Sequence, residues 1–587
     1  MLCVRLTLRR LGMGYKVPVD GRTVAESFLK RVEVSHADRV YLIKKNGSYV
    51  PLTWQELYDR AARVFKYLSE TGIKAGDKVC ISSQSCPEWT MADLGILCLG
   101  ATTVPIYHSS TLEDIAFILD NSEAKLVFVD DAAQAKKIRE AFAGLGRELP
   151  IVSFDKDFDT ISSGPVSPDL ERAIVDSVTR IRPEDEASIV YTSGTTGRPK
   201  GAVLTHSNFM SCLRGVANAV AFRHDDITVA FLPFAHILGR LESLIPIVTG
   251  VTLAFAEGIS TVSQNILEVR PTMLVSVPRI YEKIYSKIQS EAQSQPEFQR
   301  NVFNWALKIG REVARLRSVK KNIPLKLLAK HRIADRLVFR KIRSKLGGRL
   351  RLTVSGGAPL APELCEIFHA CGIKILEGYG LTETTGAVIC NRPDAYHFGT
   401  VGKPIDGIEV RIAQDGEIQL RGAMVFKEYH RNPEATKEVF TSDGWFCTGD
   451  IGEISQEGFL RITDRKKELI VTSGGKNIAP QKIENMLKAS RFVSNGMVYG
   501  DRQKYLVALV TLNHSEVRGL APEKVQVLIE QEIKSVNTQL ASYETIKRFQ
   551  ILHEDFTVEA GELTPSLKLK RKVLIQKYKE TIEGLYT

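Results

Sequence analysis

Short runs of apolar residues alternate with longer stretches of helical periodicity through much of this chain. The apolar runs predict strands over residues 125–129, 187–191, 227–232 and 352–354. Apolar positions three and four residues apart predict helices over residues 54–70 and 112–121, and a capping box of Thr53 and Glu56 opens the first of them. Strands that alternate with helices are typical of α/β lobes built on parallel sheets, which is the fold class we expect.

The pattern changes towards the C-terminus. Residues 407–422 indicate two short strands around Asp415-Gly416, a turn typical of hairpins, and so predict a small β subdomain. Beyond residue 463 follows a compact stretch rich in both basic and acidic residues, with helices expected near 481–489 and 521–538. We therefore expect a large N-terminal domain, residues 1–463, and a small C-terminal α+β domain, residues 464–587.

Composition narrows the class of protein. The chain has 587 residues, of which 44% are hydrophobic and 25% charged, as in an ordinary soluble enzyme of several lobes. Nine cysteines without a C-x-x-C pair predict neither a zinc site nor a disulfide framework, which fits a reducing cytosol. The longest apolar run, near residues 94–106, is shorter than the roughly 20 residues of a transmembrane helix. Residues 1–14 lack a secretory apolar core, and we interpret them as a ragged start, with a transit peptide as the weaker alternative.

Positive charge is concentrated in one segment. Residues 300–351 contain 17 lysines and arginines but only two acids, so they carry +15 of a chain whose net charge is +11. Apolar residues recur there at helical spacing, which predicts basic amphipathic helices. A solvated helical face and attraction to an anionic membrane surface both explain this pattern. Nucleic acid is the least favoured partner, because no base-reading module accompanies the charge.

Residues 191–201, YTSGTTGRPKG, carry the strongest chemical signal. Behind a predicted strand stand four hydroxyls, two glycines and a cation: Thr192, Ser193, Thr195, Thr196, Gly194, Gly197 and Lys200. Glycine lets backbone N–H groups converge on phosphate oxygens, and the hydroxyls and the ammonium add donors. The pattern is not a Walker loop, because Pro199 precedes the lysine and Gly201 follows it. A mobile surface loop would explain the composition but not the ordered Pro-Lys-Gly ending.

This string resembles the phosphate-loop signature of the adenylate-forming superfamily, which includes acyl-CoA synthetases, luciferases and the adenylation domains of peptide synthetases. Four further segments resemble its other core motifs, in the family's order: EGYGLTETTG (377–386), WFCTGD (445–450), TDRKKELIVTSGGKNIAP (463–480) and GELTPSLKLKR (561–571). The motifs span most of the chain. They are most similar to the long-chain fatty acyl-CoA synthetase branch.

The resemblance implies how ATP is held. The loop residues and Lys200 would neutralise the departing pyrophosphate. Glu383, with Thr192, would hold Mg²⁺, since this hard cation prefers oxygen ligands. Taken alone, Glu383 also fits an acid at the start of a helix.

The same resemblance implies a pocket for AMP. Thr382 would reach the α-phosphate and Tyr379 would stack on adenine, although core packing is its alternative. Asp450 would accept both ribose hydroxyls, with Arg465 as a further donor, although Gly-Asp alone is more often a turn. The remaining residues of this pocket are Gly356, Gly357, Ala358, Glu377, Gly378 and Gly380.

Lys568 matches the lysine that the family brings onto the carboxylate and α-phosphate for adenylation, so we expect it to act with Glu383 and Thr192 in catalysis. The Ser-x-Lys pattern distinguishes it from the neighbouring cations Lys570, Arg571 and Lys572, and a charged tail is the alternative. His236 resembles a family position near the acyl carboxylate, with a satisfied core histidine as the alternative.

The family pivots a mobile C-terminal domain about a hinge, which here corresponds to residues from Asp464 to Lys467. After that movement Gly474, Gly475 and Lys476 would face the acyl-adenylate and help to admit CoA. A lysine needed only for the first half of a reaction can be carried away by such a movement.

Together these features predict an ATP-, Mg²⁺- and CoA-dependent ligase for a long-chain fatty acid, located in the cytoplasm or peripherally on the inner face of a membrane. A ligase for another carboxylate and an acyl-AMP ligase that loads a carrier protein are the nearest alternatives. A non-catalytic, membrane-associated relative is more remote. Selectivity between neighbouring chain lengths should be gradual, because one buried methylene contributes only about 0.8 kcal/mol.

Overall fold

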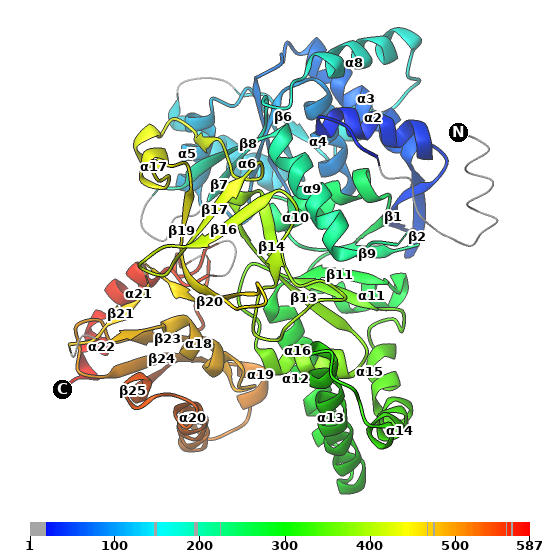
Figure 1. Ribbon diagram of the computed structural model, residues 1–587. Helices are drawn as coiled ribbons and strands as arrows, with labels where there is room; N and C mark the ends of the chain where they lie inside the picture. Colours follow the sequence, from blue (N-terminus) through cyan, green and yellow to red (C-terminus); the bar gives the residue numbers. More distant parts are fainter. Residues whose placement is uncertain are drawn as a thin grey trace.

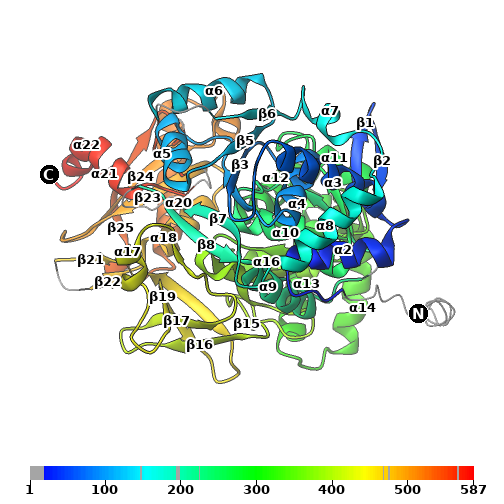
Figure 2. The same ribbon diagram turned by 90° about the horizontal axis from the view of Figure 1, so that it is seen from above.

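The computed structural model describes residues 19–145, 149–192, 198–223, 225–466, 468–473, 476–558, 560–564 and 568–587. Three sheets with flanking helices make up the large N-terminal part of the molecule, and a smaller C-terminal part lies beside it (Figure 1). Seen from above, the C-terminal elements gather on one side, next to a separate small sheet (Figure 2).

The largest sheet has the strand order β18-β8-β7-β4-β3-β5-β6. Its strands are β3 (Lys78–Ser82), β4 (Thr102–Ile106), β5 (Leu126–Val129), β6 (Ile151–Ser153), β7 (Glu186–Thr192), β8 (Lys200–Thr205) and β18 (Glu428–Tyr429). The strands from β7 to β6 pair in parallel, whereas β8 runs antiparallel to both of its neighbours, β7 and β18. One face packs against α5 (Leu112–Ser122) and α6 (Ala132–Phe142). The other packs against α3 (Trp54–Glu70), α4 (Pro87–Cys98) and α9 (His206–Val220).

Two further sheets complete the large part. The first has the order β2-β1-β10-β9, with β1 (Arg39–Lys45), β2 (Ser48–Thr53), β9 (Ile227–Ala230) and β10 (Thr252–Phe255). The second has the order β11-β12-β13-β14-β15, with β11 (Met273–Ser276), β12 (Leu352–Ser355), β13 (Lys374–Leu381), β14 (Gly386–Cys390) and β15 (Lys403–Pro404). Strands β11, β12 and β13 are parallel, so their carboxyl ends open on one edge.

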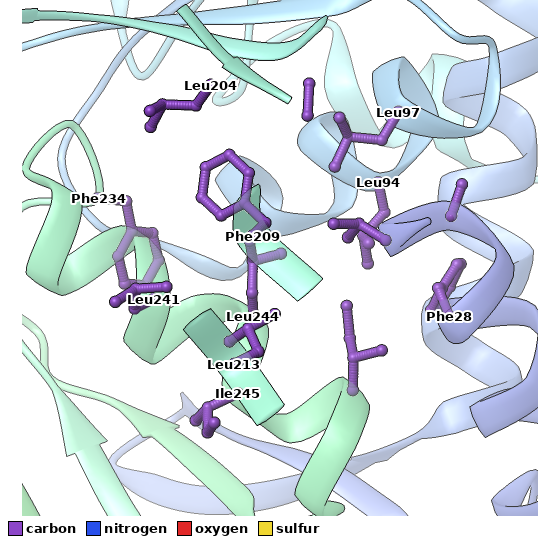
Figure 3. Packing of buried hydrophobic residues seen from close by; sticks show 14 of the residues in the cluster. Phe28, Leu94, Leu97, Leu204, Phe209, Leu213, Phe234, Leu241, Leu244 and Ile245 are labelled. Atoms are coloured by element: carbon purple, nitrogen blue, oxygen red, sulfur yellow. The ribbon is translucent and has the colours of Figure 1, made fainter. Parts of the chain in front are cut away.

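Apolar side chains from several helices meet in the centre of the large part. In Figure 3, Phe209 and Leu213 of α9 lie near Leu241 and Leu244 of α10 (Ile237–Thr249), and Phe28 comes from α2 (Val24–Ser35). A charged pair is buried in the same region, where Arg240 of α10 contacts Asp93 of α4. This core holds α10, which begins a few residues after the end of β9.

The remaining helices of the large part are peripheral or short. They are α7 (Phe158–Ser162), α8 (Pro168–Arg180), α11 (Val262–Val269), α12 (Pro278–Gln293), α16 (Pro362–Ala370), α17 (Pro433–Glu438), η1 (Ala143–Leu145) and η3 (Thr382–Thr384). Helices α11, α12 and α16 pack with β9 and β11 in a second apolar cluster.

The basic segment is helical, as its periodicity predicts. It contains α13 (Glu297–Ser318), α14 (Leu325–Ala334), the π-helix η2 (Asp335–Phe339) and α15 (Arg340–Ser344). Glu366 of α16 binds Arg311 and Arg315, which ties α13 to the body of the protein. The far end of α13 projects from the molecule (Figure 1).

The small β subdomain is a sheet in the order β16-β17-β19-β20, with β16 (Ile408–Ile412), β17 (Glu417–Gly422), β19 (Phe446–Ile454) and β20 (Leu460–Arg465). The predicted hairpin is present: β16 and β17 are antiparallel, and Gly416 at their turn has φ +86°. Only glycine adopts such a value without strain.

The C-terminal part is built on the sheet β23-β24-β25, with β23 (Val493–Tyr499), β24 (Leu506–Leu512) and β25 (Ile546–Leu552). Its other elements are β21 (Ile470–Val471), β22 (Asn477–Ile478), α18 (Pro480–Lys488), α19 (His514–Val517), α20 (Pro522–Asn537), η4 (Ser542–Glu544), α21 (Arg571–Lys577) and α22 (Lys579–Gly584). Helices α18 and α20 cover one face of the sheet, and α21 and α22 cover the other.

The predicted fold class is confirmed, because an α/β part is joined by a small β sheet and a smaller α+β part. The capping box of Thr53 and Glu56 opens α3 as expected. The domain boundary at residue 463 stays a prediction. Within the described residues, every helix is too short or too polar to cross a bilayer.

Candidate active site

Two paired strands hold the base of the predicted phosphate loop. Thr192 ends β7 and Lys200 begins β8 directly opposite it, and the Thr192 hydroxyl donates to the Lys200 carbonyl at 3.3 Å. The loop therefore leaves from the carboxyl end of a parallel strand, the usual place for a ligand in such sheets. The predicted phosphate ligands between the two residues lie outside the described residues: Ser193, Gly194, Thr195, Thr196 and Gly197.

Lys200, Tyr429 and Glu383 form a chain of contacts. The Lys200 ammonium lies 5.1 Å from the centroid of the Tyr429 ring, and the Tyr429 hydroxyl donates to Glu383 Oε1 at 2.6 Å. Burial raises the pKa of the Tyr429 phenol, and the negative charge of Glu383 raises it further, so the phenol keeps its proton. The chain brings a cation and a carboxylate from separate motifs to one side of the loop.

Asp450 is 3% exposed, and both of its oxygens have partners. Tyr379 of β13 donates to Oδ2 at 2.7 Å, and Arg465 Nε lies 3.0 Å from Oδ1. The register of β19 and β20 sets Asp450 directly opposite Arg465. Burial acts to lower the pKa of Arg465, but Asp450 and other acids nearby outweigh it and raise that pKa. The aspartate is therefore held rigidly between a phenol and a guanidinium.

Lys568, in the C-terminal part, is affected by the charges of Asp450 and Arg465. Leu563 and Leu569 form an isolated antiparallel bridge, and the Thr564 N–H donates to the Lys568 carbonyl at 2.8 Å. Loss of surrounding water lowers the pKa of the Lys568 ammonium, and the positive charge of Arg465 lowers it further. Asp450 and Glu383 act in the opposite direction. The residue keeps contact with solvent, so the lysine lies at an accessible edge of the charged group.

The positive charge of Lys568 also acts on His236. It is the N-cap of α10, and its Nδ1 accepts the Leu238 N–H at 3.1 Å. Burial lowers the pKa of His236 to about 4, and the positive charge of Lys568 contributes to that shift. The imidazole is thus neutral at pH 7 with its proton on Nε2, and it is half-buried rather than enclosed in the core.

Contacts separate Lys568 from the nearby cation Arg571. The Arg571 guanidinium binds the buried Glu484 of α18 at 2.5 Å and lies 3.5 Å from Glu468. It also donates to the Val498 carbonyl at 3.1 Å. Arg571 is committed to the interior of the C-terminal part, whereas Asp450 and Glu383 act on the charge of Lys568.

The glycine-rich strand ends lie where the AMP pocket is predicted. Gly356 is buried directly after β12, and Gly357 has φ +81°. A Cβ on Gly380 would stand 1.6 Å from the Gly386 carbonyl oxygen, so the β13–β14 turn requires glycine there. The neighbouring predicted residues are Ala358, which is exposed, and Gly378 and Thr382, which are partly exposed.

The side chain of Glu377, in the same motif, points into the interior of the protein. It is buried, and the Cys365 thiol lies 3.6 Å from its Oε1. Burial raises the pKa of Glu377 to about 7.

The structure describes only part of the hinge and of the second glycine loop. Asp464 is buried, its Oδ2 has no hydrogen-bond partner among the described residues, and burial raises its pKa to about 6. Lys476 is exposed, and its ammonium lies 5.9 Å from the Tyr543 ring within the C-terminal part. Lys467, Gly474 and Gly475 lie outside the described residues. In this conformation Asp450 acts on the charge of Lys568, whereas the Lys476 ammonium lies against a ring of the C-terminal part.

Sequence reasoning missed Tyr429 and the Arg571 network. Tyr429 stands between two motifs, and only the pairing of β18 with β8 brings it to Glu383. The sequence offers no local signal for this contact.

The residue types fit the predicted ligands. Glu383 offers a carboxylate and Thr192 a hydroxyl, both oxygen donors of the kind Mg²⁺ binds, and this ion usually completes its shell with water and substrate phosphates. Within the described residues no group of three or more histidine, cysteine, aspartate or glutamate side chains forms a complete metal site. The donor set therefore suits an ion that arrives with a polyphosphate.

Comparison with known proteins decides the family. The model of the AMP-binding enzyme family matches residues 29–430, and the model of the AMP-binding enzyme C-terminal domain matches residues 467–587. The chain belongs to the AMP-binding enzyme family. The resemblance drawn from the motifs is confirmed.

The similar proteins cover almost the whole chain. A long-chain-fatty-acid–CoA ligase of Mycobacterium tuberculosis is 37% identical, over 92% of this chain and 93% of its own. Long chain acyl-CoA synthetase 1 of Arabidopsis thaliana is 34% identical, over 92% and 88%. Among solved structures, a Mycobacterium tuberculosis fatty acyl CoA synthetase matches this AMP-binding enzyme with a TM-score of 0.63 and 25% identity, over 95% of this chain and 99% of that one. The adenylation domain of a Mycobacterium chelonae carboxylate reductase shares the fold, with a TM-score of 0.76 and 23% identity, over 96% and 91%.

Proposed function

We propose that this protein activates a long-chain fatty acid with ATP and transfers it to CoA. The arrangement that supports the proposal is the Asp450 carboxylate held by Tyr379 and Arg465, which acts on the charge of Lys568 from the C-terminal part. Similarity to long-chain-fatty-acid–CoA ligases over nearly the whole chain supports the fatty acid and CoA as substrates.

In the first half-reaction the fatty acid carboxylate attacks the α-phosphorus of ATP, and the bond to the β-phosphate oxygen breaks to release pyrophosphate. Lys568 stabilises the charge that develops between the carboxylate and the α-phosphate. Lys200 does the same for the departing pyrophosphate. Glu383 and Thr192 hold Mg²⁺, which neutralises phosphate charge when bound.

Asp450 orients the nucleotide through its ribose. Its two oxygens already accept from Tyr379 and Arg465, so the ribose hydroxyls bind to a carboxylate whose direction is set before ATP arrives. Such preorganisation removes the cost of ordering the group during binding. His236, neutral with a proton on Nε2, offers a donor to the acyl carboxylate.

In the second half-reaction the sulfur of CoA attacks the acyl carbon, the bond to AMP breaks, and the thiol proton is lost to solvent. As the family resemblance implies, we assign Lys568 to the first half-reaction alone, so that it is free to leave before this step. We propose that the C-terminal domain, residues 464–587, pivots at Asp464 and Lys467 and brings Gly474, Gly475 and Lys476 to the acyl-adenylate.

Formation of AMP and thioester from ATP, Mg²⁺ and CoA tests the function directly. The substrates are carboxylates from acetate through palmitate and oleate to coumarate. A maximum at the long chains is expected. A maximum with coumarate would indicate a ligase for another carboxylate, and pyrophosphate release without CoA thioester would indicate loading of a carrier protein. Inactivity across the panel would favour a non-catalytic relative.

We further propose that the basic segment 300–351 contacts an anionic membrane. Lys326, Lys330 and Lys341 are exposed on α14 and α15, and Ile333 and Leu337 occur between them at helical spacing. Cations beside exposed apolar side chains match the charged surface and apolar interior of a bilayer. The protein would then act in the cytoplasm and bind peripherally to the inner face of the membrane that supplies its substrate.

A further inference from the structure

The orientation of Lys568 depends on how the C-terminal part docks onto the large part. Helix α12 makes contacts there at both of its ends. Arg279 in its first turn donates to the Ser494 carbonyl at 3.0 Å and to the Ser494 hydroxyl at 3.3 Å. Gln293, its last residue, accepts from Arg491 at 3.2 Å. Arg279 follows β11 closely, so it stands beside the strand ends that border the site.

Ser494 leads from this contact into the C-terminal core. Its hydroxyl donates to Asp555, whose other oxygen accepts from Thr511 Oγ1 at 2.6 Å and from the Phe556 N–H at 2.9 Å. Ser494 is buried. The contact at Arg279 is therefore made to a fixed point of the C-terminal sheet rather than to a surface loop.

Phe556 links Asp555 to the segment that contains Lys568. Its buried ring packs in one apolar cluster with Leu563 and Leu574. Leu563 pairs with Leu569 in the bridge that holds Lys568 between them. A continuous series of packed and hydrogen-bonded groups thus joins Arg279 in the large part to the Lys568 segment.

The same helix carries an acidic side chain on which a charge of the C-terminal part acts. Burial raises the pKa of Glu282 in α12, and the positive charges of Arg279 and Lys488 oppose that shift. Lys488 belongs to α18 of the C-terminal part. The positive charge of Lys488 therefore acts on Glu282 across the interface, one helical turn after Arg279.

We propose that Arg279 is a positioning residue for adenylation, which acts by docking the Ser494–Asp555 unit so that Lys568 points at Asp450. The inference rests on the role proposed for Lys568. Arg279 contacts neither ATP nor the fatty acid in this scheme, and its effect passes through the lysine alone.

The test is a double-mutant cycle on the full-length enzyme with separate half-reactions. Arg279→Ala should lower pyrophosphate formation from ATP and palmitate in a single turnover by roughly three- to tenfold, as for the net loss of an ordinary hydrogen bond. Arg279→Lys should restore part of the rate, and Ser494→Ala, which keeps the carbonyl contact, should lose less. The KM for ATP and thioester formation from supplied palmitoyl-AMP should stay within about twofold of the wild type.

The Lys568→Ala background is decisive. If Arg279 works through the lysine, Arg279→Ala causes no additional loss when Lys568 is already alanine. Equal loss in both backgrounds, or an equal fall of thioester formation, would overturn the inference and leave the proposed function standing. Full adenylation by Lys568→Ala alone would instead overturn the role of the lysine, and this inference with it. Arg172→Ala, an arginine removed from an exposed pair on α8, is the matched control.

Discussion

The Tyr379 hydroxyl donates a hydrogen bond to Oδ2 of Asp450 at 2.7 Å, across 71 positions of sequence. The tyrosine was predicted to stack on adenine and the aspartate to bind ribose. Their bond would join the two predicted subsites into one unit, because the side chain predicted to stack on the base also holds the carboxylate predicted to bind the sugar. The unit can be tested one group at a time.

Tyr379→Phe keeps the ring and removes only the hydroxyl. A hydrogen bond to a carboxylate contributes about 1.5–3 kcal/mol, so we expect the KM for ATP to rise about tenfold or more, with a smaller change in kcat. Tyr49→Phe removes a comparable hydrogen bond, to the Phe255 carbonyl, and should leave the KM for ATP unchanged. An unaltered KM in Tyr379→Phe would show that Asp450 is oriented without the phenol.

Lys568→Ala should separate the two half-reactions. We expect adenylation to fall about 100- to 1,000-fold, the usual cost of losing a group that stabilises transition-state charge, while thioester formation from supplied acyl-AMP persists. Pyrophosphate release and thioester formation are measured separately in single turnovers. Lys570→Ala, two residues away, should behave as the wild type. Loss of both half-reactions in Lys568→Ala would argue against a lysine that serves only the first.

Glu383→Gln should weaken the use of Mg²⁺. Because the amide lacks the negative charge, we expect the Mg²⁺ concentration that gives half the maximal rate to rise about tenfold or more. Tyr429→Phe removes the donor to Glu383 Oε1 and should cause a smaller shift in the same direction. The measurement is a Mg²⁺ titration of pyrophosphate release. Glu428→Gln, an exposed neighbour of Tyr429, is the control and should leave the titration unchanged.

Glu242→Gln should change how stability depends on pH. Burial raises the pKa of Glu242 to about 8, against an ordinary 4.5, although the Thr228 hydroxyl donates to it. Between these values the folded state binds the proton that the unfolded state releases, so the carboxyl makes stability fall as pH rises from about 4.5 to 8.

A glutamine at position 242 stays neutral, so it does not make stability fall as pH rises. We expect Glu242→Gln to exceed the wild type in stability at pH 8–9 by about 2–5 kcal/mol, and the advantage to shrink towards pH 5. Thermal unfolding midpoints of both proteins across this range provide the measurement. The exposed Glu140→Gln should show no such trend. A constant difference at all pH values would mean that Glu242 does not titrate in this window.

Removing the exposed apolar side chains of the basic segment should abolish membrane binding. Leu325, Ile333 and Leu337 are 84%, 53% and 48% exposed, and we expect their joint change to serine to prevent sedimentation with vesicles of phosphatidylglycerol and phosphatidylcholine. Binding by the wild type should weaken with salt, because lysines and arginines near an anionic surface each contribute about 1 kcal/mol.

A matched triple substitution distinguishes binding by this surface from nonspecific hydrophobic binding. Ile259, Leu267 and Val527 are also exposed, and their joint change to serine should leave vesicle binding intact. Activity on dispersed palmitate should be the same in both triple variants. Binding of the wild type to RNA but not to vesicles would assign the basic surface to nucleic acid instead.

Local pattern predicted local structure well, because the residues that decide it are neighbours in the chain. The capping box at Thr53 and the turn at Gly416 both depend on side chains or backbone within a few positions. Strand and helix positions were correct within a few residues for the same reason. The family could be identified from the motifs, because their order and residue types can be recognised without knowledge of the fold.

Contacts between distant residues required the tertiary structure. The Ser-x-Lys pattern distinguishes Lys568 from Arg571, three positions away, and the structure adds a physical difference: Arg571 binds Glu484, whereas Asp450 acts on the charge of Lys568. Tyr429 meets Glu383 only because β18 pairs with β8. Such choices depend on strand register and on the docking of one part of the chain against another.

By itself, then, the sequence determined the elements, the α/β class and the adenylate-forming chemistry, since each rests on short-range spacing or on the residue types within a motif. The tertiary structure alone decided which acid binds Arg571, which partners hold Asp450 and where α12 meets the C-terminal part. These depend on packing between segments hundreds of residues apart, where burial and hydrogen-bond geometry select among side chains that look alike in sequence.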